Sequence, residues 1–407
     1  MDVLLVKYAY PAYVADFYRR HPGLSGAAYA VQKAAIDEDG FWWGAAWTRA
    51  LAPLGHRVTE VVMNAGPMQK AWAREHGVPV PRLDWMLTIL QAQLREVRPE
   101  ALFVQSFLGL SLSSLRELRA SCPSLRRVVG WCGAAPALRP VFAACDAMLS
   151  CVPEIVGTLR AAGHSCTHLH HAFDPVVLER IDLGRPPSID LSFVGSVVSR
   201  EVHGERERVL RLLAARTPLQ VFTSWGDGPA LKFWKGVGGL AAHGVFRALA
   251  GVGLERPWLQ GLPVVGRAAV WDARPRPRRL RIPRARMRPA VYGLPMFQTL
   301  RDSKVTLDVH GNHSGRSASN LRLFEATGMG TCLLTDWKPD LHLLFDPERE
   351  VATFRSGEEC VEKALWLLEH PDEREAIARA GRVRTLREHR FEDRAPVLAA
   401  VLEGATP

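Results

Sequence analysis

Short, mainly apolar runs alternate with helix-period segments through the first half of the chain. The runs lie at residues 3–6, 58–63, 101–105, 128–131 and 147–151. Strands without polar alternation are typical of a parallel sheet that helices cover on both faces. Between two of these runs, Leu83, Leu90 and Leu94 recur on one helical face, and Pro99 follows the last turn. The alternation of strand and helix predicts a doubly wound α/β domain.

The same alternation resumes after a polar break at residues 182–188, which contains Gly184, Pro186 and Pro187. A new strand is predicted from Asp190, followed by a helix near 205–215 and strands at 219–223, 305–309, 332–335 and 350–354. Two helices are expected to close the fold. Each follows a capping-box pattern, Ser356 with Glu359 and Asp372 with Glu375.

A chain of 407 residues favours two domains. We therefore predict an α/β fold of two Rossmann-like lobes, the first at residues 1–187 and the second at 188–407. Residues 224–290 fit neither pattern, because they are rich in Gly and Trp and then in Arg and Pro. We interpret them as an insertion or mobile segment of the second lobe.

The positive charge of the chain is concentrated in this insertion. The formal net charge is +10, and eight arginines with no acidic residue lie between Arg274 and Arg288. Without them 44 basic residues face 42 acidic ones, so a nucleic-acid partner is disfavoured. Trp258 and Trp271 precede or flank these arginines, which predicts a peripheral contact with an anionic membrane or an acidic acceptor. The alternative interpretation is that this arginine-rich segment is a solvated loop without a partner.

The cysteines and the N-terminus predict a cytoplasmic protein. The seven cysteines form no C-x-x-C pair, which favours reduced, buried thiols over disulfides or a zinc site. The first residues lack the basic flank and apolar core of a signal peptide. Residues 236–254 contain six glycines, His243 and Arg247 and make a poor membrane span. The basic segment is the one feature that predicts peripheral attachment to the inner face of the membrane.

Several familiar catalytic motifs are missing. The sequence has no G-x-G-x-x-G after its first strand, no G-x-x-x-x-G-K-[ST] and no G-x-S-x-G, which disfavours dehydrogenases, P-loop enzymes and ordinary serine hydrolases. Histidines cluster at 164–171, where a metal site and a plain polar loop are both open interpretations. His310 and Asn312 follow a predicted strand, where doubly wound sheets bind ligands.

Two first-lobe residues are candidates for a general base. Residues 37–39 read Asp-Glu-Asp, which resembles the metal-binding D-x-D motif of another class of sugar transferases but also suits a solvated helix end. Asp39 precedes bulky aromatic residues, and a carboxylate in such surroundings can have a raised pKa. His21 is the second candidate.

The stretch at residues 308–335 is the most informative one. A strand ends, a Gly/Ser-rich loop follows, and a helix is predicted from near Asn320 to Gly328. Free backbone N–H groups at such a helix start favour a diphosphate, and Ser319 and Arg322 lie there as well. Glu325 is one turn further on and could accept both hydroxyls of a ribose. A plain crossover helix with exposed Arg and Glu is the alternative.

This stretch also carries a resemblance. The run N-L-R-L-F-E-A-T-G-M-G-T at 320–331 resembles the donor-site segment of two-lobed GT-B glycosyltransferases, and more closely that of the CgeB-like, group 1 branch. The segments at 40–64, 169–175, 190–196, 350–356 and 380–389 resemble other parts of that branch. The resemblance implies a transferase that takes a nucleoside diphosphate sugar, with no other cofactor, and an unknown glycan, lipid-linked or protein acceptor. No metal is needed if the helix N–H groups and Arg322 stabilise the departing diphosphate.

The resemblance also implies roles for single residues. Glu325 would hold the nucleotide ribose, and Gly195 and Ser196 would bring their backbone near the diphosphate. Related retaining enzymes carry a Glu-x7-Glu pair, and here the first position is Ser317, which leaves the donor sugar and the stereochemistry open. A nucleotide-sugar epimerase on the same fold and a non-catalytic spore-coat or envelope protein remain alternatives.

Overall fold

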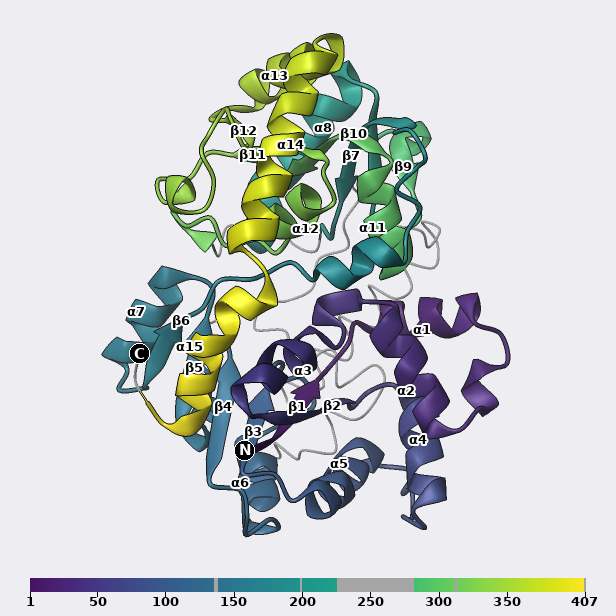
Figure 1. The fold of residues 1–407 in the computed structure, drawn as a ribbon, viewed down its shortest axis with the longest axis vertical. Coiled ribbons are helices and arrows are strands. Elements are labelled where there is room, and N and C mark those ends of the chain that lie inside the picture. Colours follow the sequence, from purple (N-terminus) through teal and green to yellow (C-terminus); the bar gives the residue numbers. More distant parts are fainter. Residues whose placement is uncertain (135–137, 198–199, 225–281, 312–313, 406–407) are drawn as a thin grey trace, which may run out of the picture.

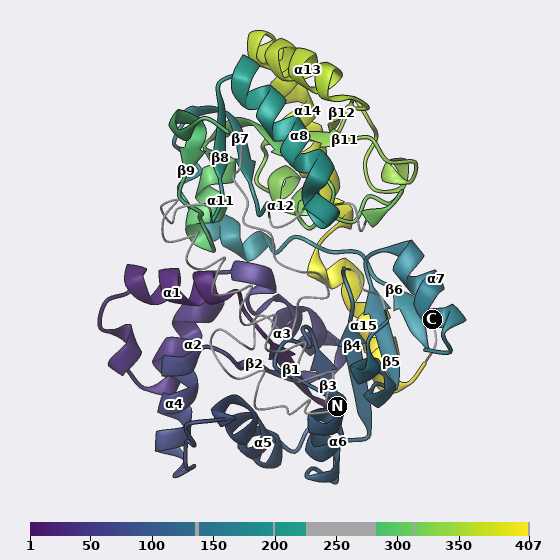
Figure 2. The same ribbon diagram turned by 180° about the vertical axis from the view of Figure 1, so that it is seen from behind.

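The computed structural model describes residues 1–134, 138–197, 200–224, 282–311 and 314–405. They form two stacked lobes, each a parallel six-stranded sheet with helices around it (Figures 1 and 2). The predicted α/β fold of two Rossmann-like lobes is confirmed.

The first lobe places β1 between β2 and β3, and its strand order is β2-β1-β3-β4-β5-β6. Its strands are β1 (Asp2–Lys7), β2 (Arg57–Val62), β3 (Ala101–Val104), β4 (Arg127–Trp131), β5 (Ala147–Ser150) and β6 (Cys166–His168). Its helices are α1 (Pro11–Arg20), α2 (Tyr29–Glu38), α3 (Ala46–Leu51), α4 (Gly66–Glu75), α5 (Trp85–Val97), α6 (Leu112–Ala120) and α7 (Pro153–Ala161). The order reverses at β1 and β3, which makes their carboxyl ends a topological switch point.

The second lobe has the order β12-β11-β10-β7-β8-β9, so its switch point lies between β7 and β10. Its strands are β7 (Ile189–Val194), β8 (Leu219–Phe222), β9 (Met287–Arg288), β10 (Ser303–Asp308), β11 (Cys332–Asp336) and β12 (Ala352–Phe354). Its helices are α8 (Arg200–Arg216), α11 (Leu294–Arg301), α12 (Arg322–Gly328), α13 (Gly357–Glu369) and α14 (Pro371–Glu388).

The central strands are buried on both faces, as their apolar runs predict. In β1 the side chains from Val3 to Val6 have almost no exposed surface, and β3 is buried throughout. Every strand pair in the two sheets is parallel. The seven cysteines are free, and all but Cys145 are buried.

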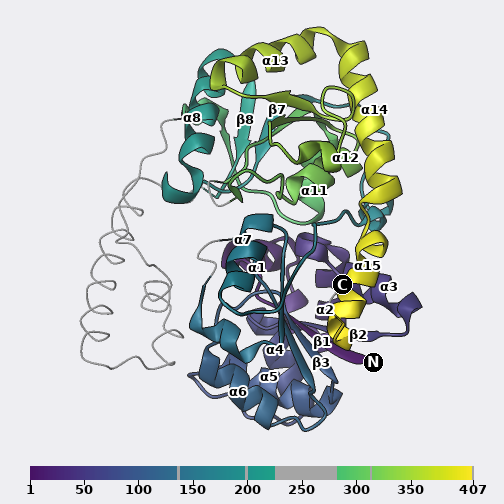
Figure 3. The ribbon, with the colours of Figure 1, turned by 90° about the vertical axis from the view of Figure 1, so that its left-hand side faces the viewer.

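The last helix, α15 (Phe391–Glu403), crosses back and packs on the first lobe (Figure 3). Phe391, Leu398 and Leu402 join the first-lobe core, where the rings of Phe391 and Trp47 lie 4.9 Å apart. The prediction of two closing helices was wrong, because the described chain ends in three. Sequence periodicity does not show which lobe an amphipathic helix will cover.

Of the two predicted capping boxes, one forms only its serine half and the other does not form. In the first, the Glu359 carboxylate accepts from the backbone N–H of Arg355 and not from that of Ser356. Ser356 caps α13, where its hydroxyl accepts from the backbone N–H of Glu359 at 3.2 Å. Asp372 is no cap, because α14 begins at Pro371 and His370 is its N-cap residue. Proline suits the first helical position, where no backbone N–H is needed, so the helix starts before Asp372.

The predicted insertion at 224–290 is corrected at its C-terminal end. Met287 and Arg288 form β9, which pairs with β8 at the edge of the second sheet. A two-residue strand within an arginine-rich run has no apolar pattern, so periodicity could not reveal it. Residues 225–281, with Trp258, Trp271 and five of the eight arginines, lie outside the described residues. In the described part of the chain, no helix combines the length and apolar character needed to span a membrane.

Candidate active site

A cavity of about 520 Å³ lies between the lobes, a size typical of small-molecule sites. It opens beyond the carboxyl ends of β7 and β10, the switch point of the second sheet. Its second-lobe lining includes Gly195, Ser196, Arg206, Asp308, Asn320, Arg322 and Glu325, and its first-lobe lining consists of Tyr10, Pro11, Ala12, Phe41 and Trp42. Five of the residues predicted for the site therefore share one cavity.

Glu325 and Arg322 form a buried ion pair on α12. The Arg322 Nη1 atom lies 2.8 Å from the Glu325 carboxylate, and both side chains are largely buried. Burial raises the pKa of Glu325, Arg322 opposes that shift, and Asp308 adds to it. The other Arg322 terminal nitrogen donates to the Met296 sulfur at 3.4 Å. The pair presents one acceptor and one cation to the same cavity.

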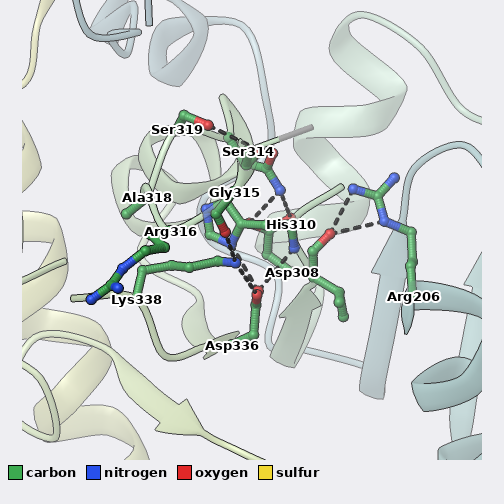
Figure 4. A network of polar contacts seen from close by, with 12 residues as sticks. Arg206, Asp308, His310, Ser314, Gly315, Arg316, Ala318, Ser319, Asp336 and Lys338 are labelled. Carbon is green, nitrogen blue, oxygen red and sulfur yellow. Dashed lines mark hydrogen bonds and ion pairs between the residues drawn. The ribbon is translucent and has the colours of Figure 1, made fainter. Parts of the chain in front are cut away.

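Arg206 of α8 lines the cavity and bonds to the backbone of two loops beside it, and Figure 4 shows this side chain next to the end of β10. Its Nε and Nη2 atoms donate to the Val309 carbonyl at 2.9 and 2.6 Å, and Nη1 donates to the Ser196 carbonyl at 2.8 Å. Burial lowers its pKa, although Asp308 and Asp336 act in the opposite direction. Sequence reasoning missed Arg206, because it is one of four arginines within 200–211 and only packing distinguishes it.

Asp308, at the end of β10, is a second site residue that sequence reasoning did not select. It is buried, and both its carboxylate oxygens accept from the Asn320 side-chain amide at 3.0 Å. This contact holds the start of α12 against the end of β10. The position after a strand in an α/β sheet was the available indication.

Two other predicted residues, Ser319 and His310, are not part of the cavity lining. Ser319 is buried and donates to Ser314 at 3.0 Å. His310 donates its backbone N–H to an Asp336 oxygen at 2.8 Å, and its Nδ1 lies 2.7 Å from that oxygen (Figure 4). Burial alone would raise the pKa of Asp336, but His310 and Lys338 hold it at about 2. Asn312 lies outside the described residues.

Ser317, which stands where related enzymes carry their first Glu, contacts the first lobe. Its hydroxyl donates to Glu154 of α7 at 2.7 Å, and the same carboxylate accepts from the Arg316 backbone at 2.9 Å. These bonds connect the loop before α12 to the first lobe and hold the pKa of Glu154 down against the effect of its partial burial.

Comparison with protein families identifies this half of the molecule. Residues 206–400 match the model of a family described as glycosyl transferase-like. This part of the chain belongs to the glycosyl transferase-like family. The match starts at Arg206 and includes Asp308, Asn320, Arg322 and Glu325. No curated protein matches the chain in sequence.

Solved glycosyltransferases share the whole two-lobed GT-B fold. Sucrose-phosphate synthase from Thermosynechococcus elongatus aligns with a TM-score of 0.52 at 11% identity, over 99% of this chain and 98% of its own. Anabaena HepE, solved with UDP-glucose, aligns at 0.53 and 10% identity, over 99% of both chains. AviGT4, a glycosyltransferase of avilamycin A biosynthesis, aligns at 0.52 and 13% identity, over 100% and 99%. At these identities the likeness shows the fold.

In this glycosyltransferase-like protein the two candidate bases do not line the cavity. Asp39 is buried at the end of α2, and Arg20 donates to both its oxygens at 2.9 Å. The ring of His21 packs on Phe17, with centroids 4.7 Å apart. Asp37 pairs with Lys33. The acidic run is thus a helix end held by cations, and it lies behind the cavity wall.

The clustered histidines are partly buried, and His170 and His171 each have a ring nitrogen shielded from solvent. The His171 ring lies 6.0 Å from Trp43 and 5.2 Å from Trp131, and burial lowers its pKa to about 4. Burial also lowers the pKa of His170, to about 3. Within the described ranges, no group of three or more His, Cys, Asp or Glu is placed to hold a metal ion.

Proposed function

We propose that this protein transfers a sugar from a nucleoside diphosphate sugar to an acceptor hydroxyl, with the donor bound on the second-lobe wall of the cavity. The observation that carries this proposal is the Glu325–Arg322 pair, which lines a cavity of ligand size at the switch point of the second sheet. HepE, solved with UDP-glucose, has the same fold.

Glu325 accepts the two hydroxyls of the ribose. Its carboxylate is buried, and its ion pair with Arg322 at 2.8 Å leaves further lone pairs free to accept. A ribose presents two adjacent hydroxyl donors. A buried carboxylate that such donors satisfy is more stable than one facing a partly empty cavity, which favours binding.

Arg322 and Arg206 stabilise the departing diphosphate. Both line the cavity, and the Nε atom of Arg322 is buried without a hydrogen-bond partner among the described residues. Arg206 keeps its charge beside the Ser196 loop while its N–H groups fix the backbone. Fixed cations placed where negative charge develops lower the barrier of such a transfer. On this basis we propose that no divalent cation is needed.

Ligand screening followed by product analysis tests the proposal. Thermal unfolding with a panel of nucleoside diphosphates and nucleotide sugars identifies the donor, since a ligand at 100 times its Kd stabilises by about 2.7 kcal/mol. Mass spectrometry of the products then separates transfer to an acceptor from epimerisation of the donor. Binding without any product points to a non-catalytic protein, and the absence of nucleotide binding contradicts the proposal.

A further inference from the structure

The first-lobe wall of the cavity is aromatic and apolar. Among the described residues, every charged side chain that lines the cavity belongs to the second lobe. The Tyr10 ring lies 4.9 Å from Trp42 and 5.8 Å from Phe41, and Tyr10 is 49% exposed. The two walls of the cavity therefore suit different chemical groups. The charged wall suits the nucleotide, and the aromatic wall suits an apolar surface of the second substrate.

The backbone at Trp42 is strained. Trp42 has φ 43° and ψ 68°, and Trp43 has φ 76°, a region that bulky side chains rarely occupy. Gly40 and Gly44 flank them, also with positive φ. Such strain persists only where the surroundings impose it, and it concentrates at functional sites.

Two anchors impose this conformation. Lys7, in a buried pair with Glu60, donates to the Gly44 carbonyl. Trp43 is inserted into the first-lobe core, where its ring lies 5.1 Å from Trp131. Between these anchors, Trp42 packs against the edge of that core and also lines the cavity.

A polar group lies behind this wall, at the switch point of the first sheet. A void of about 20 Å³, lined by Lys7, Gln105, Phe41 and Trp42, lies at the carboxyl ends of β1 and β3. The Gln105 side-chain amide is buried there, and neither of its polar atoms has a hydrogen-bond partner among the described residues. An amide both donates and accepts, as a sugar hydroxyl does. A buried unpaired amide is rare and calls for a partner.

We propose that this wall binds a sugar ring of the acceptor, whose apolar C–H face stacks on Trp42 and Tyr10. The inference rests on the proposed function and names the class of its second substrate. Stacked in this way, the ring exposes its hydroxyls to the second lobe. One hydroxyl oxygen bonds to the anomeric carbon of the donor as the bond from that carbon to the diphosphate breaks. The nucleoside diphosphate leaves with the electron pair, and the hydroxyl proton passes to water.

Binding of small probes tests this proposal in the presence of the nucleoside diphosphate that the protein binds. The probes are methyl glycopyranosides and disaccharides, a hexitol, which is also rich in hydroxyls but has no ring, and a simple phenol. Saturation-transfer NMR should detect transfer from the protein to the ring C–H protons of at least one pyranoside. It should detect no transfer to the hexitol. We expect Trp42→Ala to weaken that binding at least tenfold and Trp42→Phe to restore most of it.

Two controls separate this site from the donor site. Nucleotide affinity, measured by calorimetry, should stay within twofold in both Trp42 variants. Trp366→Ala, which removes a 42% exposed tryptophan on α13, should change neither affinity. The inference is overturned if no pyranoside binds, if only the phenol binds, or if Trp42→Ala binds the pyranoside as the parent does. A parent protein that binds no nucleotide contradicts the proposed function instead.

Discussion

The Glu325 carboxylate lies 2.8 Å from the Arg322 guanidinium, and both side chains are turned into the cavity between the lobes. The two residues are one helical turn apart on α12, a helix of only seven residues. Asn320 fixes the entry to that helix by donating to Asp308. The Met296 sulfur accepts from Arg322, so with the start of the helix fixed the pair is held in place, as a ligand-binding group requires.

Replacement of Glu325 should weaken nucleotide binding. In Glu325→Ala the ribose hydroxyls lose their acceptor, which costs about 1–3 kcal/mol, or about tenfold or more in Kd. Calorimetry with the nucleotide that binds the parent measures this loss. Glu117→Ala on α6, an exposed acidic residue of the first lobe, serves as the matched control and should keep the parent affinity. Unchanged affinity of Glu325→Ala for every nucleotide would remove the residue from the site.

Replacement of Arg206 should lower both stability and nucleotide affinity. Arg206→Met leaves the carbonyls of Val309 and Ser196 without their donors, and each unsatisfied buried acceptor costs about 1–3 kcal/mol. Urea denaturation should show a lower midpoint with an unchanged slope. Arg208→Met, on the exposed side of the same helix, is the control. A midpoint equal in both variants would show that the contacts of Arg206 contribute little to stability.

Much of the fold could be predicted from the sequence, because apolar strand runs and helical stripes are local patterns. Val3–Val6 reads as a buried strand whatever lies around it. The short edge strand at Met287–Arg288 and the crossing of α15 depend on pairing and packing between distant segments, which no local pattern encodes.

Some residues of the candidate site could likewise be predicted from a local pattern, and others could not. Glu325 and Arg322 belong to a recognisable run, whereas Arg206 and Asp308 look ordinary until the fold brings them to the cavity. The aromatic wall was equally hidden, because the sequence does not show that Tyr10 and Trp42, which are far apart in the chain, line one cavity.

Transfer should not depend on a divalent cation. If Arg206 and Arg322 balance the charge of the leaving diphosphate, turnover with excess chelator should stay within about twofold of the untreated rate, since the cations are built into the chain. The measurement is the initial transfer rate before and after metal removal, with magnesium and manganese added back. Activity lost to chelator and recovered only with a divalent ion would assign that role to a metal.

Stability should fall as the pH drops from about 6.5 to 4. Burial lowers the pKa of His389 to about 4, and it lowers the pKa of His171 to about 4 as well. The His389 Nε2 atom lies 2.7 Å from the Leu344 carbonyl, and Nδ1 lies 2.7 Å from the Arg394 guanidinium, which suits a neutral ring. Above pH 6.5 the ring is neutral in both states and has no effect. Between 6.5 and 4 only the unfolded chain takes up the proton, so the folded state loses stability.

Urea denaturation at pH 8, 6.5, 5 and 4 measures this loss. His389→Gln removes one titrating group, so its free energy of unfolding, whatever its value at pH 8, should decline less steeply from 6.5 to 4. His342→Gln, with an exposed ring in the second lobe, should keep the parent slope. The carboxylate of Asp336, with its pKa near 2, adds its own loss only below pH 4. Equal slopes in the parent and His389→Gln would show that His389 is not the titrating group.

The arginine-rich segment at 274–288 should bind anionic lipid in a salt-dependent manner. Each basic residue near an anionic surface contributes about 1 kcal/mol, and screening shortens the Debye length from about 10 Å at 0.1 M salt to about 3 Å at 1 M. Among the three described arginines, Arg288 donates to Gln220 at 3.1 Å and stabilises the sheet edge. A variant that changes the other seven to Gln therefore removes charge and keeps that contact.

Liposome co-sedimentation separates docking from catalysis. The parent should sediment with anionic vesicles at low salt but neither at high salt nor with neutral vesicles, and the sevenfold variant should stay in solution throughout. If the segment only docks, the variant keeps its transfer rate to a soluble acceptor, because Arg206 and Arg322 are untouched. If that rate falls together with sedimentation, the arginines act in the site itself. Identical sedimentation of parent and variant in every condition would exclude a membrane role for these charges.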